Sequence, residues 1–242
     1  MKRALTAGVT FLFLYFAGFA GYLLANSSFF DLTEIKLKGN AVVSRDEIIA
    51  LSGLRIGANI LRISRSQALA GILSHPYIKE TSISRRFPDK LEIMVSERSP
   101  MAMIHAEGRY LILDGDGYCL EEADLVKAGK WPLPCVLCSS SAAQMMPGEK
   151  SEDTGVLAAL ALIKKLDPYF LENILEFDAP TAEKLAVINR DGLKVLFGQP
   201  EDLDRKLQNY EELLIKNAEK CNAETLNYVD LRYDTQITLN WK

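Results

Sequence analysis

Cys135 and Cys138 form a C-x-x-C pair, the pattern in this sequence with the most obvious chemistry. In an oxidising compartment such a pair can be a disulfide or the redox centre of a thiol oxidoreductase. A zinc site would need a second pair, and the two remaining cysteines, Cys119 and Cys221, stand alone. A reactive thiol would need a low pKa at a helix N-terminus, and the prolines at 132 and 134 argue against a helix there. An extended segment would separate the two cysteines by about 10 Å, beyond the limit of roughly 7 Å for a disulfide. We therefore expect incidental cysteines and keep the oxidoreductase as an alternative.

Other residue types that could do chemistry are sparse. His75 and His105 have no cysteine or carboxylate at metal-ligand spacing. The Asp-Gly-Asp-Gly run at 114–117 resembles the start of a calcium loop, but its glycine falls at position 4 instead of 6, so we expect a turn. The sequence contains no nucleotide-binding, serine-hydrolase or H-E-x-x-H motif. Its net charge of -4 gives no basic signature for nucleic acid. We expect a protein that binds other proteins, with no enzymatic activity, cofactor or metal.

The N-terminal segment is the strongest structural signal. Residues 5–24 carry no charge, and twenty helical residues span about 30 Å, the thickness of a bilayer core. Lys2 and Arg3 precede them, and positive flanks stay in the cytoplasm. We expect a cytoplasmic stub at 1–3, a transmembrane helix at 4–25 and an extracytoplasmic remainder, which is a single-pass type II protein of the inner (plasma) membrane. The alternative, a cleaved signal peptide, has a shorter apolar region and a small-x-small cleavage site, which residues 23–26 do not form.

Residues 30–99 predict a small unit in the order strand, helix, helix, strand, strand. Apolar and polar residues alternate at 32–37, 78–86 and 90–97, as in half-buried strands. Ser44 and Glu47 form a capping box for one helix, and Gly53 is suited to end it. Ser64 is suited to cap a second helix.

Residues 100–242 predict a larger mixed α/β unit, so the fold class is α+β. Asp-Gly turns at 114–117 and 191–192 favour two hairpins. Helices are expected at about 154–166 and 203–221, and strands at 174–177, 185–189, 193–198, 225–233 and 236–241. The last of these alternates and closes the chain. A closing strand tends to lie at a sheet edge, where unpaired main-chain groups can accept a partner strand.

Several stretches together carry a family resemblance. They lie at 35–40, 76–78, 85–91, 97–102, 191–198 and 228–233. In order and spacing, behind one N-terminal anchor, they resemble the bacterial cell-division family called FtsQ, or DivIB in Gram-positive species. The resemblance implies a POTRA domain, a small module for protein contact, at 30–99 and a C-terminal FtsQ/DivIB-type domain at 100–242.

The resemblance also implies a function. Such a protein is a scaffold of the division machinery at the septum: it binds FtsB- and FtsL-like division proteins and helps organise septal cell-wall synthesis, reaching the synthase indirectly. The implied contact is the last strand of the second domain. Arg232, Tyr233 and Asp234 match the family's RYD stretch and Trp241 its closing aromatic, whereas the usual small residues after RYD are replaced by threonine and glutamine. The runner-up is another POTRA-bearing envelope assembly or transport factor.

Overall fold

The structure is a computed structural model that describes residues 2–106, 108–124, 133–139, 144–217, 224–233 and 237–242. Side chains are described from residue 10 onward, apart from those of 106 and 214–217. The chain forms two compact units, Met1–Glu97 and Arg98–Lys242. Each unit has its own sheet and its own core.

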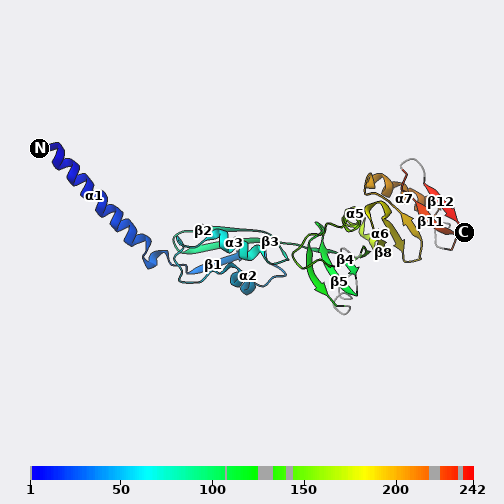
Figure 1. Cartoon of the computed structure of the whole chain (residues 1–242), viewed down its shortest axis with the longest axis horizontal. Coiled ribbons are helices and arrows are strands. Elements are labelled where there is room, and N and C mark those ends of the chain that lie inside the picture. Colours follow the sequence, from blue (N-terminus) through cyan, green and yellow to red (C-terminus); the bar gives the residue numbers. More distant parts are fainter. Residues whose placement is uncertain (1, 107, 125–132, 140–143, 218–223, 234–236) are drawn as a thin grey trace. The chain divides into compact units, whose positions relative to one another are not determined.

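The first unit begins with helix α1, Lys2–Ala25, drawn in blue in Figure 1. Its side chains from Thr10 to Leu24 are exposed. The main-chain carbonyl of Ala25 accepts a hydrogen bond of 2.8 Å from Asn59 Nδ2, which caps the end of the helix. Among the described residues, no helix combines the length and the apolar character that crossing a membrane requires.

The rest of the first unit is a three-stranded sheet with two helices. Its elements are η1 (Ser28–Phe30), β1 (Glu34–Lys38), α2 (Arg45–Ser52), α3 (Arg65–Leu73), β2 (Ile78–Arg86) and β3 (Lys90–Glu97). The sheet order is β1-β3-β2, with β1 parallel and β2 antiparallel to β3. The predicted order of strands and helices is confirmed.

Local signals explain where the two helices begin and end. Ser44 Oγ accepts from the Glu47 main-chain N–H, and Ser64 Oγ accepts from that of Gln67. Gly53 ends α2 with a φ of 65°, the left-handed conformation that glycine adopts without strain. The two serine caps and the glycine at the end of α2 are confirmed, whereas the Glu47 carboxylate of the expected capping box lies 3.4 Å from His75 Nε2.

The two helices pack closely together and help to bury one face of the sheet. Leu91, Ile93 and Ile83 from the strands are fully buried, as are Ile48 of α2 and Ile72 of α3. A Cβ atom added at Gly71 would lie 2.1 Å from the Leu51 carbonyl oxygen, so α2 and α3 are in main-chain contact.

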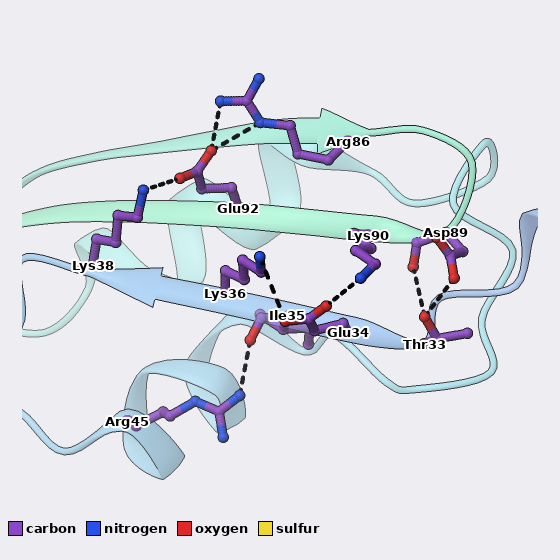
Figure 2. Close-up of polar contacts among 10 residues, drawn as sticks. All are labelled: Thr33, Glu34, Ile35, Lys36, Lys38, Arg45, Arg86, Asp89, Lys90 and Glu92. Carbon is purple, nitrogen blue, oxygen red and sulfur yellow. Dashed lines mark hydrogen bonds and ion pairs between the residues drawn. The ribbon is translucent and has the colours of Figure 1, made fainter.

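The other face of this sheet carries an ion network, shown in Figure 2. Glu92 at its centre bonds Lys38 Nζ at 2.6 Å and Arg86 Nη2 at 2.7 Å, which joins all three strands. These hydrogen bonds lower the pKa of Glu92 to about 2. Arg45 Nη2 donates to the Ile35 carbonyl on the side of β1 away from β3. The alternation of residues 90–97 places Glu92 on this face correctly, but its two cations cover it, leaving its side chain only 10% exposed.

The second unit is built on a nine-stranded sheet. Its strands are β4 (Pro100–Ala106), β5 (Arg109–Asp114), β6 (Cys119–Ala123), β7 (Cys135–Leu137), β8 (Ile174–Asp178), β9 (Ala186–Asn189), β10 (Lys194–Leu196), β11 (Leu226–Asp230) and β12 (Thr238–Trp241). The order across the sheet is β12-β11-β10-β9-β8-β7-β4-β5-β6. The helical elements are α5 (Thr154–Ile163), α6 (Pro168–Glu172), η3 (Ala182–Lys184) and α7 (Leu203–Asn217).

The two Asp-Gly turns are confirmed. Asp114 Oδ1 accepts from the main-chain N–H groups of Asp116 and Tyr118, and Gly117 and Gly192 have φ values of 85° and 87°. Asp114 Oδ2 also accepts a hydrogen bond of 2.7 Å from Arg98 Nη1. Both carboxylate oxygens of Asp114 are therefore hydrogen-bonded within this unit.

Some elements differ from the sequence prediction. β4 was not predicted, and α5 ends at Ile163 instead of about 166. Asp167, expected to end that helix, instead caps α6 by accepting from the Tyr169 N–H. The described part of α7 ends at Asn217, and the expected continuation to 221 reaches into residues outside the described ones.

Candidate functional site

Strand β12 lies at one edge of the nine-stranded sheet, as expected for the closing strand. It pairs antiparallel with β11, with Leu239 opposite Val229 and Thr238 opposite Asp230. β11 in turn pairs in parallel with β10. Among the strands that the structure describes, β12 has no neighbour on its other side. That side presents main-chain N–H and C=O groups that another strand could bond.

The side chains of β12 differ in how far they are buried. Ile237 and Leu239 pack against the core of the unit, whereas Thr238 and Trp241 face outward. Asn227 Nδ2 donates to the Asn240 side chain at 2.7 Å and to the Trp241 carbonyl at 3.2 Å. These bonds hold the end of β12 against β11, so Trp241, which is 53% exposed, sits on an ordered strand.

Arg232 is fixed by Asp230, two residues before it. Its Nε and Nη2 atoms donate to the two carboxylate oxygens of Asp230 at 2.9 and 2.7 Å, and its main-chain N–H donates to the same group at 3.0 Å. Asp230 is 5% exposed, and the hydrogen bonds from Arg232 lower the pKa of this carboxyl group. A bidentate pair of this kind fixes the plane of the guanidinium group.

Tyr233 follows Arg232 and projects into solvent. Its side chain is 65% exposed, and its ring centroid lies 5.6 Å from the Arg232 guanidinium carbon. The predicted site residues Arg232, Tyr233 and Trp241 therefore all lie on the last two strands or directly after one of them. Asp234, the fourth, lies outside the described residues.

A cavity of about 320 Å³ adjoins Tyr233. Gly198, with a φ of 65°, leaves room for Arg232, because a Cβ atom there would lie 2.9 Å from Arg232 Cγ. Lys206 is 5% exposed and its Nζ donates to the carbonyls of Phe197 and Gln199, which holds the loop after β10 in place. The lining residues are Glu183, Gly198, Gln199, Glu201, Asp202, Lys206, Arg232 and Tyr233.

Sequence reasoning missed the parts that support this site. Asp230, Lys206 and Gly198 were not singled out, although the Asp-x-Arg spacing at 230–232 is a readable signal. A lysine is rarely buried unless its ammonium group has hydrogen-bond partners. The partners of Lys206 are two loop carbonyls, whose positions the sequence does not show, so its burial was not predicted.

The structure describes three of the four cysteines. Cys119, Cys135 and Cys138 are free thiols, and Cys135 lies in β7, as the extended interpretation of that segment predicted. Burial raises the pKa of Cys135, and it raises that of Cys138 to about 11. A nucleophilic thiol needs a lowered pKa. Cys221 lies outside the described residues.

The histidines make local contacts. His75 Nδ1 accepts from the Tyr77 N–H at 3.2 Å, and the His105 ring stacks on Tyr110 at 4.7 Å. Within the part of the chain that the structure describes, no group of three or more histidine, cysteine or acidic side chains could hold a metal ion.

Comparison with known proteins accounts for both units. Residues 30–98 match the POTRA domain of FtsQ type. Residues 102–232 match the C-terminal domain of the cell-division proteins FtsQ and DivIB. The second match covers more than half of the chain.

Whole proteins with the same names are similar along most of their length. The cell-division protein FtsQ of Syntrophotalea carbinolica is 26% identical over 91% of this chain and 77% of its own length. DivIB of Clostridium tetani is 24% identical over 85% of this chain and 77% of its own length. FtsQ of a Geobacter species is 28% identical over 91% of this chain and 81% of its own length.

These matches exclude the runner-up, an unrelated POTRA-bearing factor, because they extend through the second unit as well. The family is of the cell-division scaffold type and is not a known class of enzyme. Order of domains, extent of the matches and the names of the relatives agree, and the chain therefore belongs to the FtsQ/DivIB family of bacterial cell-division proteins.

Proposed function

We propose that this protein is a non-catalytic, membrane-anchored scaffold of the divisome that binds FtsB- and FtsL-like division proteins through the β12 edge. Through them it helps to organise septal cell-wall synthesis, with the synthase reached indirectly. The observation that carries the proposal is the side of β12 that pairs with no described strand, with the exposed side chains of Tyr233 and Trp241 beside it.

Strand addition suits this edge. Main-chain hydrogen bonds to an added strand give affinity, and side chains beside the edge give specificity. Tyrosine, tryptophan and arginine are the residues that most often dominate binding energy at interfaces. The Asp230 pair holds Arg232 in one orientation before binding, which reduces the conformational entropy that a partner must overcome.

The proposed anchor rests on the sequence. Residues 5–24 are uncharged and follow two cations, which favours a span with the N-terminus in the cytoplasm. The POTRA and C-terminal domains, taken as 30–99 and 100–242, are then extracytoplasmic, and the protein acts at the division septum.

Co-purification tests the proposed site. Tyr233→Ala and Trp241→Ala should each weaken recovery of FtsB- and FtsL-like partners from the native membrane, because each removes an exposed aromatic anchor. Tyr169→Ala is the matched control, since Tyr169 is 69% exposed on α6 of the same unit, and α6 contacts β8, which three strands separate from β12. Partner recovery equal to that of the unmodified protein in both site variants would refute the site.

Localisation tests the function separately. A fluorescent fusion of the full chain should concentrate at mid-cell in dividing cells. Uniform envelope staining would contradict the divisome role, whatever the partner experiment gives.

A further inference from the structure

Three phenylalanines form a patch at one end of the first unit. The rings of Phe29 and Phe30 lie 5.1 Å apart, and those of Phe30 and Phe87 lie 6.5 Å apart. Phe29 is 58% exposed and Phe87 is 61% exposed. We call Phe29, Phe30 and Phe87 the phenylalanine patch. Exposed aromatic side chains gathered in this way mark a contact site rather than scattered surface residues.

The loop between α2 and α3, residues 53–64, ties this patch to the end of α1. The Ile60 N–H donates to the Phe30 carbonyl at 2.8 Å. From the same loop, Asn59 Nδ2 bonds the Ala25 carbonyl at 2.8 Å, and Arg62 donates to Asn26 Oδ1. The patch and the last turn of α1 are therefore held in one body. Phe29 follows Ala25 by four residues, so it lies within about 14 Å of the helix end.

The side chains around the patch suit a lipid surface. The loop 53–64 contains two exposed arginines, Arg55 and Arg62, and no acidic residue. It also exposes Leu61, next to Ile60. Two acids lie nearby: Asp31, which follows Phe30, is half-buried, and Asp89 accepts a hydrogen bond of 2.6 Å from Thr33 Oγ1. Apolar rings beside arginines are typical of surfaces that rest in the headgroup region, with the rings at the acyl boundary.

We propose that the phenylalanine patch lies in the headgroup region of an anionic bilayer, with Phe29 and Phe87 inserted at the acyl boundary. This inference rests on the proposed membrane anchor. A helix that ends at the bilayer surface brings the patch within reach, since each polar layer of a bilayer is roughly 5–7 Å thick. The first domain is then fixed against the membrane at two points, the end of α1 and the patch.

Depth-dependent fluorescence quenching tests the proposal. The full chain is placed in nanodiscs of phosphatidylcholine and phosphatidylglycerol in equal parts, with Trp131→Phe and Trp241→Phe removing the native fluorophores. Phe29→Trp and Phe87→Trp are then introduced separately. Lipids brominated near the headgroup end of the acyl chain should quench each at least about twofold more than they quench Met94→Trp. Met94 is the matched control, because it is 54% exposed and lies farther along β3. It is four residues, or about 13 Å, beyond Lys90, the first residue of β3 after the turn that contains Phe87.

A further variant separates this inference from the anchor. Tyr15→Trp places the fluorophore near the middle of the proposed span, where lipids brominated towards the end of the acyl chain are the matching quencher. Quenching of the tryptophan at 15 together with both patch positions supports the proposal. Quenching at 15 but not at 29 and 87 overturns the patch contact and leaves the anchor standing. Absence of quenching at 15 overturns the anchor and the patch contact with it. A blue-shifted emission at 87 without bromine quenching would assign the patch to a protein neighbour and also overturn the proposal.

Discussion

Gly71 is the residue of α3 at which the main chains of α2 and α3 come into close contact. In an exposed helix, replacing glycine by alanine stabilises a protein by about 1 kcal/mol, because alanine has the higher helix propensity. At Gly71 the new Cβ atom would lie 2.1 Å from the Leu51 carbonyl oxygen, where an ordinary contact is 3.4 Å or more. Since that oxygen belongs to the main chain of α2, the two helices would have to separate by about 1 Å.

The clash decides the sign of the effect. Overpacking of this kind costs about 1–3 kcal/mol, which exceeds or offsets the gain in propensity. With a clash costing about 2 kcal/mol and a propensity gain of about 1 kcal/mol, we expect Gly71→Ala to destabilise the first unit by about 1 kcal/mol, equivalent to a roughly fivefold rise in the population of its open form.

Hydrogen–deuterium exchange measures this change in the full chain and resolves the units. Peptides from β2 and β3 should exchange roughly five times faster in Gly71→Ala, while peptides from β8 and β9 should be unchanged. Gly155→Ala is the reciprocal variant, because its Cβ atom would lie 1.9 Å from the Ala179 carbonyl oxygen in the second unit. Ala70→Gly, on an exposed position of α3, calibrates the propensity contribution at about 1 kcal/mol.

The same variants bear on function. If partners bind at the β12 edge, Gly71→Ala should retain partner recovery and Gly155→Ala should lower it. Slower exchange in the first unit of Gly71→Ala would refute the packing argument. Loss of partners in Gly71→Ala with an intact second unit would refute the assignment of the site to that unit.

Three further predictions concern charged and thiol groups. The folded pKa of Glu92 is about 2, below its usual 4.5. The stabilisation by Lys38 and Arg86 should therefore be complete above pH 4.5 and be lost as the pH falls towards 2. Unfolding measured over this pH range should show the loss in the unmodified protein and not in Glu92→Gln. Lys206→Met should destabilise the second unit by about 2 kcal/mol, since two loop carbonyls lose a charged donor, and urea unfolding followed by tryptophan fluorescence should detect it. Because burial raises the pKa of Cys138 to about 11, iodoacetamide at pH 8 should alkylate it at least about tenfold more slowly than a free cysteine peptide, as measured by mass spectrometry; equal rates would contradict the burial of this thiol.

The sequence predicted best those features that a few neighbouring residues determine. The caps at Ser44 and Ser64 and the turns at Asp114 and Gly192 depend on hydrogen bonds and backbone conformations within four residues. Each was therefore readable before any tertiary contact was known.

Features that depend on distant partners escaped prediction. Residues 100–106 begin with proline and carry no clear alternation, and they form β4 because β5 and β7 pair with them on either side. At the candidate site, the aromatic residues were named from the family resemblance. The burial of Asp230 and Lys206 was not, because it depends on how β10, β11 and the following loop come together.

The brevity of β12 has a consequence for the chain before any partner is bound. An open edge can template association with a stray strand, including one from another copy of the same protein. β12 contributes only four residues to the edge, Thr238–Trp241, so an accidental strand can form few main-chain bonds with it. A dedicated partner would add contacts with Tyr233 and Trp241, which a chance encounter lacks. A short edge thus limits association between copies that have no partner bound.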